Sequence, residues 1–258
     1  MNLLSSVLPI LGVDSRSQPS AVGTGFLIQV LEKCLLVTAA HVADEMQNSP
    51  LYIPSTPGES LIELPQTAIC TKAPPAGRDE DKIDLAFWDL PAAITAQIEN
   101  AFWIVPSLFL LPAVQGLPPQ QLSFVGFPHK ATRIKYGTRK LTSGPEQFTG
   151  VCVEEALYQQ VNAGLSTHLA IEFDHKRAMS AGQIVTPKDR HGMSGGPVYA
   201  LTDGGTLEGL PKIRIVGVAI EHHRSEGLLL ATKTELLLQM ISKHFQLTQI
   251  AVSDARLV

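Results

Sequence analysis

Residues 191–199, with the sequence HGMSGGPVY, place Ser194 among three glycines. Glycine loses more conformational freedom on folding than other residues, and it is used where a backbone turns sharply or approaches another group closely. Such a setting suits a serine nucleophile whose neighbouring N–H groups stabilise an oxyanion. A short Gly-rich loop without a chemical role fits the same residues, so this segment alone leaves both interpretations open.

A nucleophilic serine needs a general base, usually histidine because its pKa lies near neutral pH, and a carboxylate that orients this base. Among eight histidines, His41 is the best candidate, because it directly follows the apolar run LLVTAA and its ring would emerge from a rigid strand. Asp84 is the best carboxylate, since it precedes an apolar run and a buried carboxylate needs a hydrogen-bonding partner. A structural histidine and a strand-capping acid remain the alternatives. Asp79, Glu80 and Asp81 fit solvated loop charges better.

Short apolar runs predict the strands that would position these residues: 23–30, 34–40, 83–90, 121–128 and 213–220. Stretches rich in proline and glycine separate the runs, a pattern typical of an antiparallel β-barrel or sandwich. The sequence EEALYQQV predicts a short helix. The sequence TKTELLLQMISKHF, residues 232–245, predicts a longer helix with an apolar face and with Thr232 or Thr234 as its N-cap.

The composition limits the classes of protein. A length of 258 residues, 45% of them hydrophobic, suits one large domain or two closely packed halves. A net charge of -4 without a basic cluster argues against a nucleic-acid partner, and no apolar run reaches the roughly 20 residues that span a bilayer. The apolar start MNLLSSVLPILGV lacks the basic residues and the cleavage site of a signal peptide. Cys34, Cys70 and Cys152 are an odd number of widely spaced cysteines, so we expect a reduced, cytoplasmic protein.

Three segments together carry a family resemblance. TAAHV around His41, IDLAFWDL around Asp84 and GMSGGPV around Ser194 resemble the catalytic segments of trypsin-like serine peptidases with the chymotrypsin fold. The chain order and the separations, 43 and then 110 residues, are also similar to that family. The resemblance covers about residues 20–245 and implies two six-stranded antiparallel β-barrels with a cleft between them, to which the sequence adds a C-terminal helix. Residues 1–19 and 246–258 are then an N-terminal segment and a C-terminal tail.

The resemblance implies a serine endopeptidase and a role for each residue. Ser194 would be the nucleophile, His41 the general base and then acid, and Asp84 the orienting carboxylate. The backbone N–H groups of Gly192 and Ser194 would form the oxyanion hole. The implied partner is a protein or peptide substrate, and no cofactor is implied.

Met193 stands where many secreted members of that family have an aspartate. The chain also lacks their disulfides and any similar activation sequence, so it is closer in type to stand-alone bacterial trypsin-like peptidase domains. Met193 cannot accept the charge of a freed amino terminus. We therefore expect its packing, or a regulatory protein partner, to order the oxyanion hole, while Gly195 and Gly196 allow close backbone approach.

Substrate preference is less readable from the sequence. In the family, the residue six positions before the serine often forms the floor of the substrate pocket, and Lys188 at this position would favour acidic substrates. Asp189 and Arg190 beside it leave a solvated loop open as an alternative. Four further residues are expected near the pocket wall: His191, Ile220, Glu221 and His222. The adjacent Glu221, His222 and His223 do not predict a metal site, because neighbouring side chains rarely converge on one ion.

Two other functions fit parts of the sequence. A catalytically silent, protease-like binding module would keep the fold without turnover. A serine esterase of the α/β-hydrolase type fits because GMSGG satisfies the pattern G-x-S-x-G. That fold needs its acid and histidine after the serine, and strands that alternate with helices, which the strand-rich pattern here does not favour.

Overall fold

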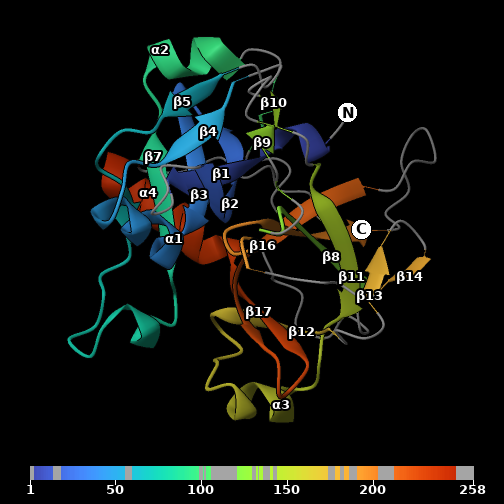
Figure 1. The fold of residues 1–258 in the computed structure, drawn as a ribbon. Helices are drawn as coiled ribbons and strands as arrows, with labels where there is room; N and C mark the ends of the chain where they lie inside the picture. Colours follow the sequence, from blue (N-terminus) through green and yellow to red (C-terminus); the bar gives the residue numbers. More distant parts are fainter. Residues whose placement is uncertain are drawn as a thin grey trace.

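Two antiparallel β-sheets lie side by side and make up most of the fold (Figure 1). The fold is given by a computed structural model. The residues that it describes are 3–13, 19–55, 60–98, 101, 103–105, 121–129, 132, 134–135, 140–141, 144–173, 178–180, 183–185, 191–202 and 212–247. All strand pairs of the two sheets are antiparallel, so the described chain lacks the parallel sheet of an α/β-hydrolase, and the α/β-hydrolase fold is wrong for this chain.

The first sheet has the strand order β5-β4-β1-β2-β3-β7-β6. Its strands are β1 (Val7–Val13), β2 (Pro19–Val30), β3 (Lys33–Ala39), β4 (Tyr52–Pro54), β5 (Leu61–Glu63), β6 (Ile69–Cys70) and β7 (Leu85–Asp89). The strands at the two ends of this order, β5 and β6, are separated in the chain by residues 64–68, which include Pro65, a residue that cannot donate a ladder hydrogen bond. The sheet has seven short strands where the resemblance implied six.

The second sheet has the order β12-β17-β16-β15-β8-β11-β13-β14. Its strands are β8 (Gln121–Gly126), β11 (Glu146–Val151), β12 (His168–Glu172), β13 (Ala178–Ser180), β14 (Gln183–Val185), β15 (Pro197–Thr202), β16 (Lys212–His223) and β17 (Leu228–Lys233). An antiparallel bridge between Cys152 and Ile171 joins the end of β11 to β12 and closes six of the strands into a ring. The β13–β14 hairpin extends this ring. A separate pair, β9 (Ile134–Lys135) and β10 (Lys140–Leu141), lies outside both sheets.

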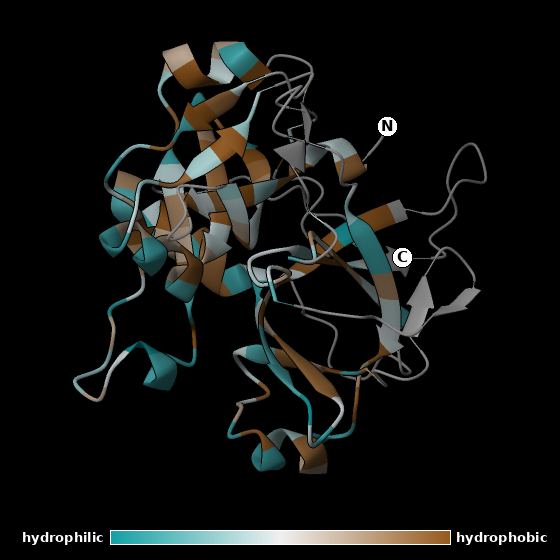
Figure 2. Cartoon of the chain, viewed as in Figure 1, coloured by the Kyte–Doolittle hydropathy of each residue, from teal (hydrophilic) through white to brown (hydrophobic). Residues whose placement is uncertain are grey.

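Hydrophobic residues run along the strands of both sheets (Figure 2), and buried apolar side chains form three clusters within and between the sheets. In the second sheet, the rings of Phe124, Phe148 and Phe173 pack with centroids 4.9 to 5.5 Å apart. Two further buried clusters each contain residues of both sheets, so the sheets share a continuous core. Each predicted apolar run corresponds to a strand, because short runs with turn-forming neighbours are a reliable sign of buried strands. The predicted all-β architecture is confirmed.

The helices are short except the last. They are α1 (Ala40–Asp44), α2 (Ala92–Thr95), α3 (Glu155–Gln160) and α4 (Thr234–Phe245), with 3-10 turns η1 (Leu3–Ser6), η2 (Glu45–Gln47), η3 (Arg78–Glu80) and η4 (Ala96–Ile98). Both predicted helices, α3 and α4, are present, and the apolar face of α4 packs in a cluster that contains residues of both sheets. Within the described residues, no helix has the length and apolar character to cross a membrane.

Two details differ from the expectations. Helix α4 begins at Thr234 with Lys233 as its N-cap and without a side-chain cap. Thr232 lies in β17 instead, where its hydroxyl bonds a distant carbonyl described below. Strand β1 lies within the segment 1–19 that we set apart from the domain, yet it pairs with β2 along its whole length, so residues 7–13 belong to the first sheet.

Candidate active site

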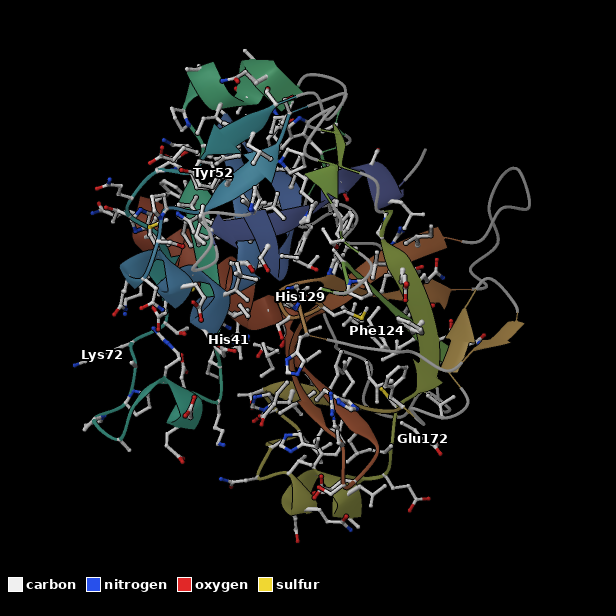
Figure 3. The ribbon with its side chains drawn as sticks, viewed as in Figure 1. His41, Tyr52, Lys72, Phe124, His129 and Glu172 are labelled. Atoms are coloured by element: carbon white, nitrogen blue, oxygen red, sulfur yellow. The ribbon has the colours of Figure 1, made fainter. Side chains whose placement is uncertain are left out.

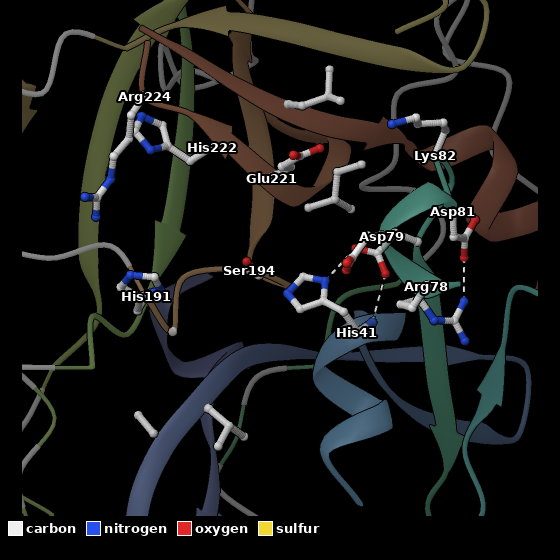
Figure 4. Close-up of a pocket in the computed structure, with 16 residues that line it drawn as sticks. His41, Arg78, Asp79, Asp81, Lys82, His191, Ser194, Glu221, His222 and Arg224 are labelled. Atoms are coloured by element: carbon white, nitrogen blue, oxygen red, sulfur yellow. Dashed lines mark hydrogen bonds and ion pairs between the residues drawn. The ribbon is translucent and has the colours of Figure 1, made fainter. Parts of the chain in front are cut away.

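His41 lies at the end of the first sheet that faces the second (Figures 3 and 4). Asp84 is its hydrogen-bonded neighbour. Strand β3 ends at Ala39, and His41 lies in the first turn of α1 that follows. Asp84 directly precedes β7, the neighbour of β3, and the ladder places Leu85 opposite Ala39. The antiparallel pairing therefore brings two residues that are 43 positions apart into contact.

The Asp84 carboxylate holds His41 at two points. Oδ1 accepts the backbone N–H of His41 at 2.8 Å, and Oδ2 lies 2.6 Å from its ring Nδ1. An ionised carboxylate can only accept, so Nδ1 carries a proton and Nε2 remains the acceptor of the neutral ring. This tautomer and orientation suit a general base that acts through Nε2.

Asp84 is held in an unusual backbone conformation. Its φ is 45°, in the left-handed region that non-glycine residues rarely adopt, and the residue is only 6% exposed. Such a conformation costs about 1–3 kcal/mol and persists only where neighbouring contacts determine it. Here the Asp84 carbonyl accepts the N–H of Ala40 at 3.0 Å while the carboxylate binds His41, so both ends of the residue are fixed to α1.

The charges around His41 favour its protonated form. Burial is the largest influence and lowers the pKa of His41, because it disfavours the charged ring. The hydrogen bond and charge of Asp84, together with the charges of Glu221 and Glu45, act in the opposite direction and outweigh burial. The pKa of His41 is therefore raised above its ordinary value of 6.5.

The second sheet clamps the segment that leads into Asp84. His168 Nε2 lies 2.5 Å from the carbonyl of Lys82, and the Thr232 hydroxyl donates to the carbonyl of Ile83 at 2.7 Å. Both donors come from adjacent strands, β12 and β17, and both residues are buried. Two successive carbonyls before Asp84 are thus bound to the opposite half of the molecule.

Arg78 fixes the same segment from the side of the first sheet. Its Nε donates to Asp44 Oδ2 at 2.7 Å, and its Nη1 donates to Asp81 Oδ2 at 2.6 Å. Asp44 is the last residue of α1, the helix that carries His41. Arg78 therefore ties the loop before Asp84 to the helix that presents its partner.

Removing the Thr232 hydroxyl tests how much this clamp stabilises the fold. In Thr232→Val the shape is kept, but the buried Ile83 carbonyl loses its donor. We expect the free energy of unfolding to fall by about 1–3 kcal/mol, the usual cost of an unpaired buried group. Denaturant unfolding measures this, with Thr232→Ser as the control that keeps the hydroxyl. A Val variant as stable as the wild-type protein would contradict the clamp.

Ser194 lies in the loop of residues 191–196, which we name the oxyanion loop. Four successive carbonyls of this loop are bound: that of His191 by His129 N–H (2.7 Å), that of Gly192 by the Thr24 hydroxyl (2.6 Å), that of Met193 by Gly196 N–H (3.1 Å) and that of Ser194 by Thr24 N–H (2.9 Å). Within the described chain, the N–H groups of Gly192 and Ser194 have no such partner. Because a peptide group is planar and trans, each bound carbonyl fixes the direction of the N–H that follows it. The loop therefore fixes two unused donors.

Gly195 and Gly196 are required by close packing, as expected. A Cβ on Gly195, whose φ is 88°, would lie 2.1 Å from the carbonyl oxygen of Thr24 and from Thr38 Oγ1. A Cβ on Gly196 would lie 1.9 Å from the carbonyl oxygen of Val125. Met193 is only 3% exposed and packs in the apolar core of the second sheet, as its expected role of filler requires.

One cleft of about 450 Å³ brings these parts together. Figure 4 shows Ser194 facing the His41 ring across it, with Glu221 nearby. The Ser194 hydroxyl makes no hydrogen bond within the described part of the chain. Catalytic hydrogen bonds often shorten only when substrate binds, so we expect the hydroxyl to reach His41 Nε2 in the complex with substrate. The cleft is also lined by all four residues expected near the pocket wall: His191, Ile220, Glu221 and His222.

The remaining predicted pocket residue, Lys188, lies outside the described residues. Glu221 follows a β-bulge between Ala219 and Glu221 in the pairing of β16 with β17. Its carboxylate lies 3.2 Å from His223 Nε2. In the described part of the chain, no three His, Cys, Asp or Glu side chains are grouped so that they could hold a metal ion.

Sequence reasoning missed four residues that position the site: Thr24, Arg78, His168 and Thr232. His168 was treated as one of the ordinary histidines, and Thr232 as a helix cap. Their partners lie between 3 and 168 positions away, and most of these contacts cross from one sheet to the other. No local pattern of residue types could indicate them.

No family model and no curated protein matches this chain. Among solved structures, GrC superimposes with a TM-score of 0.59 at 11% identity, over 95% of this chain and 97% of GrC. The VesB protease of Vibrio cholerae superimposes with a TM-score of 0.55 at 16% identity, over 93% of this chain and 64% of VesB. Both are serine proteases with the chymotrypsin fold. The chain therefore has the chymotrypsin-like fold that the sequence resemblance implied.

Proposed function

We propose that this protein is a serine endopeptidase that uses Ser194, His41 and Asp84. The observation that carries the proposal is their convergence on one cleft: a histidine held in the base tautomer by a buried carboxylate, opposite a serine whose loop leaves two N–H donors unused. The chymotrypsin-like fold that the chain shares with these two structures also supports the proposal.

The proposed reaction follows from the geometry. Ser194 Oγ attacks the scissile carbonyl carbon while His41 Nε2 takes the hydroxyl proton, and Asp84 stabilises the resulting imidazolium. The N–H groups of Gly192 and Ser194 bind the oxyanion of the tetrahedral intermediate. His41 then gives its proton to the leaving amine as the scissile C–N bond breaks. The acyl group stays on Ser194 Oγ as an acyl-enzyme. Water, deprotonated by His41, releases the acid and restores Ser194.

Labelling with a fluorophosphonate and cleavage of a peptide library test the proposal. We expect the protein to be labelled at Ser194 and to cleave internal peptide bonds. A protein that is neither labelled nor active would be the silent binding module, and labelling without peptide cleavage would indicate an esterase. The library also tests whether the enzyme, through Lys188, prefers substrates with Asp or Glu before the scissile bond. Lys188→Asp should shift this preference toward Lys or Arg.

We further propose that the enzyme works inside the cell, as a stand-alone domain of the bacterial type. The three cysteines support this, since each is free rather than paired in a disulfide. A regulatory protein partner stays a prediction. Its test is co-purification of a protein that changes the labelling rate of Ser194.

The pH dependence of the reaction follows from His41. The base must be neutral, and its pKa is raised above the ordinary value. Activity should therefore be lost as the pH falls through a midpoint above about 6.5. Values of kcat/KM measured between about pH 5 and pH 9 give this midpoint. Glu221→Gln should move the midpoint down, because its charge raises the pKa of His41. A midpoint well below 6.5 in the wild-type enzyme would contradict the arrangement of charges described here.

A further inference from the structure

We propose that Thr24 is a positioning residue that holds the oxyanion loop in the conformation with both donors directed into the cleft. The inference rests on the proposed peptidase function and names a residue on the first sheet that this function needs. Thr24 lies in β2, far from Ser194 in the sequence, and is fully buried.

Thr24 makes three hydrogen bonds toward the second half of the molecule. Its hydroxyl donates to the carbonyl of Gly192 at 2.6 Å and accepts the N–H of Phe127 at 2.8 Å. Its backbone N–H donates to the carbonyl of Ser194 at 2.9 Å. One side chain therefore joins the oxyanion loop to the residue that follows β8, and one residue binds the loop on both sides of Met193.

Gly192 needs this restraint. Its φ of 93° lies in the region that glycine reaches freely, and a Cβ there would lie 2.6 Å from the Phe127 carbonyl oxygen, so only glycine fits. A glycine between two unrestrained peptide groups can rotate either of them. Here the peptide before Gly192 is fixed through the His191 carbonyl and His129, and the peptide after it through Thr24. Rotating the Gly192 N–H out of the cleft would break the bond from His129, and Thr24 keeps the following peptide, on the other side of the Gly192 Cα, from turning with it.

The hydroxyl and the shape of Thr24 can be separated by substitution. Thr24→Val keeps the volume and the backbone bond to Ser194 but leaves the Gly192 carbonyl and the Phe127 N–H without their partner. Thr24→Ser keeps the hydroxyl. Thr149→Val is the matched control, because it removes another threonine hydroxyl, which bonds Ser123 at 3.0 Å between β11 and β8, away from the oxyanion loop.

We expect Thr24→Val to lower kcat by up to about 10²-fold, the lower end of the effect of losing one oxyanion-hole donor, because the hydroxyl holds the peptide next to a donor rather than the donor itself. KM and the midpoint of the acid limb should stay as in the wild-type enzyme, because neither substrate binding nor the His41–Asp84 pair is touched. Thr24→Ser should restore most of kcat, and Thr149→Val should leave it unchanged. A folded Thr24→Val enzyme with wild-type kcat overturns the proposal.

Amide hydrogen exchange gives a readout that needs no activity. The N–H groups of Gly195 and Gly196 are bonded to the carbonyls of Ala219 and Met193. In Thr24→Val their exchange should rise about tenfold, because a lost buried hydrogen bond makes local opening of the loop easier, and in Thr149→Val it should not. Unchanged exchange overturns the role of Thr24 even in an active peptidase. If the wild-type protein proves inactive, the proposed function fails, and exchange alone decides whether Thr24 holds the loop. If Thr24→Val does not fold, Thr24→Cys, which has a similar volume and only a weak donor, is used in its place.

Discussion

Ser194→Ala abolishes peptide cleavage and fluorophosphonate labelling while the protein stays folded. The variant lacks the proposed nucleophile, and the loss of such a residue from a serine protease lowers kcat by about 10⁶-fold. Stability should change by no more than about 0.5 kcal/mol, because the Ser194 hydroxyl makes no hydrogen bond within the described chain. Turnover, labelling and denaturant unfolding of the two proteins measure these effects together.

Ser225→Ala is the control for Ser194→Ala. Its hydroxyl bonds only the neighbouring Glu226 among the described side chains, on an exposed turn between β16 and β17. This variant should keep wild-type activity. If Ser194→Ala retains near-wild-type peptidase activity, the assignment of the whole site is wrong.

Asp84→Asn should lower kcat by about 10⁴-fold. The carboxylate accepts both from the ring Nδ1 and from the backbone N–H of His41, and an amide has only one oxygen for these two donors. Where the amide nitrogen faces Nδ1, the ring must carry its proton on Nε2, and that nitrogen can no longer take the proton of Ser194. The loss of the negative charge should also lower the pKa of His41, since Asp84 is a cause of its raised value.

Asp79→Asn is the matched control, because Asp79 lines the same cleft but is exposed. It should leave kcat within a small factor of the wild-type value. Kinetics of the two variants, with a ¹H–¹⁵N titration of the His41 ring, separate the orienting role from a general effect of charge. An active Asp84→Asn enzyme beside an inactive Asp79→Asn enzyme would show that the wrong carboxylate was chosen.

The sequence by itself predicted five of the strands and supplied the residues that we propose for the site. Buried strands show as short apolar runs between turn-forming residues, a local pattern that needs no partner to be recognised. Ser194, His41 and Asp84 were proposed from their settings in the chain together with the order and spacing of three segments that resemble one family. The three glycines around Ser194 also follow from local geometry.

Only the tertiary structure decided how these residues are held. Thr24 bonds Gly192 from the opposite sheet, and Thr232 bonds the carbonyl before Asp84 rather than capping α4. Whether a hydroxyl caps a helix or binds a distant carbonyl depends on which backbone group lies opposite it, and this is set by the packing of two sheets. Such contacts join residues up to 168 positions apart and leave no periodic or local trace in the chain. The sequence by itself therefore determined which groups can react, and the packing of the two sheets determined which groups orient them.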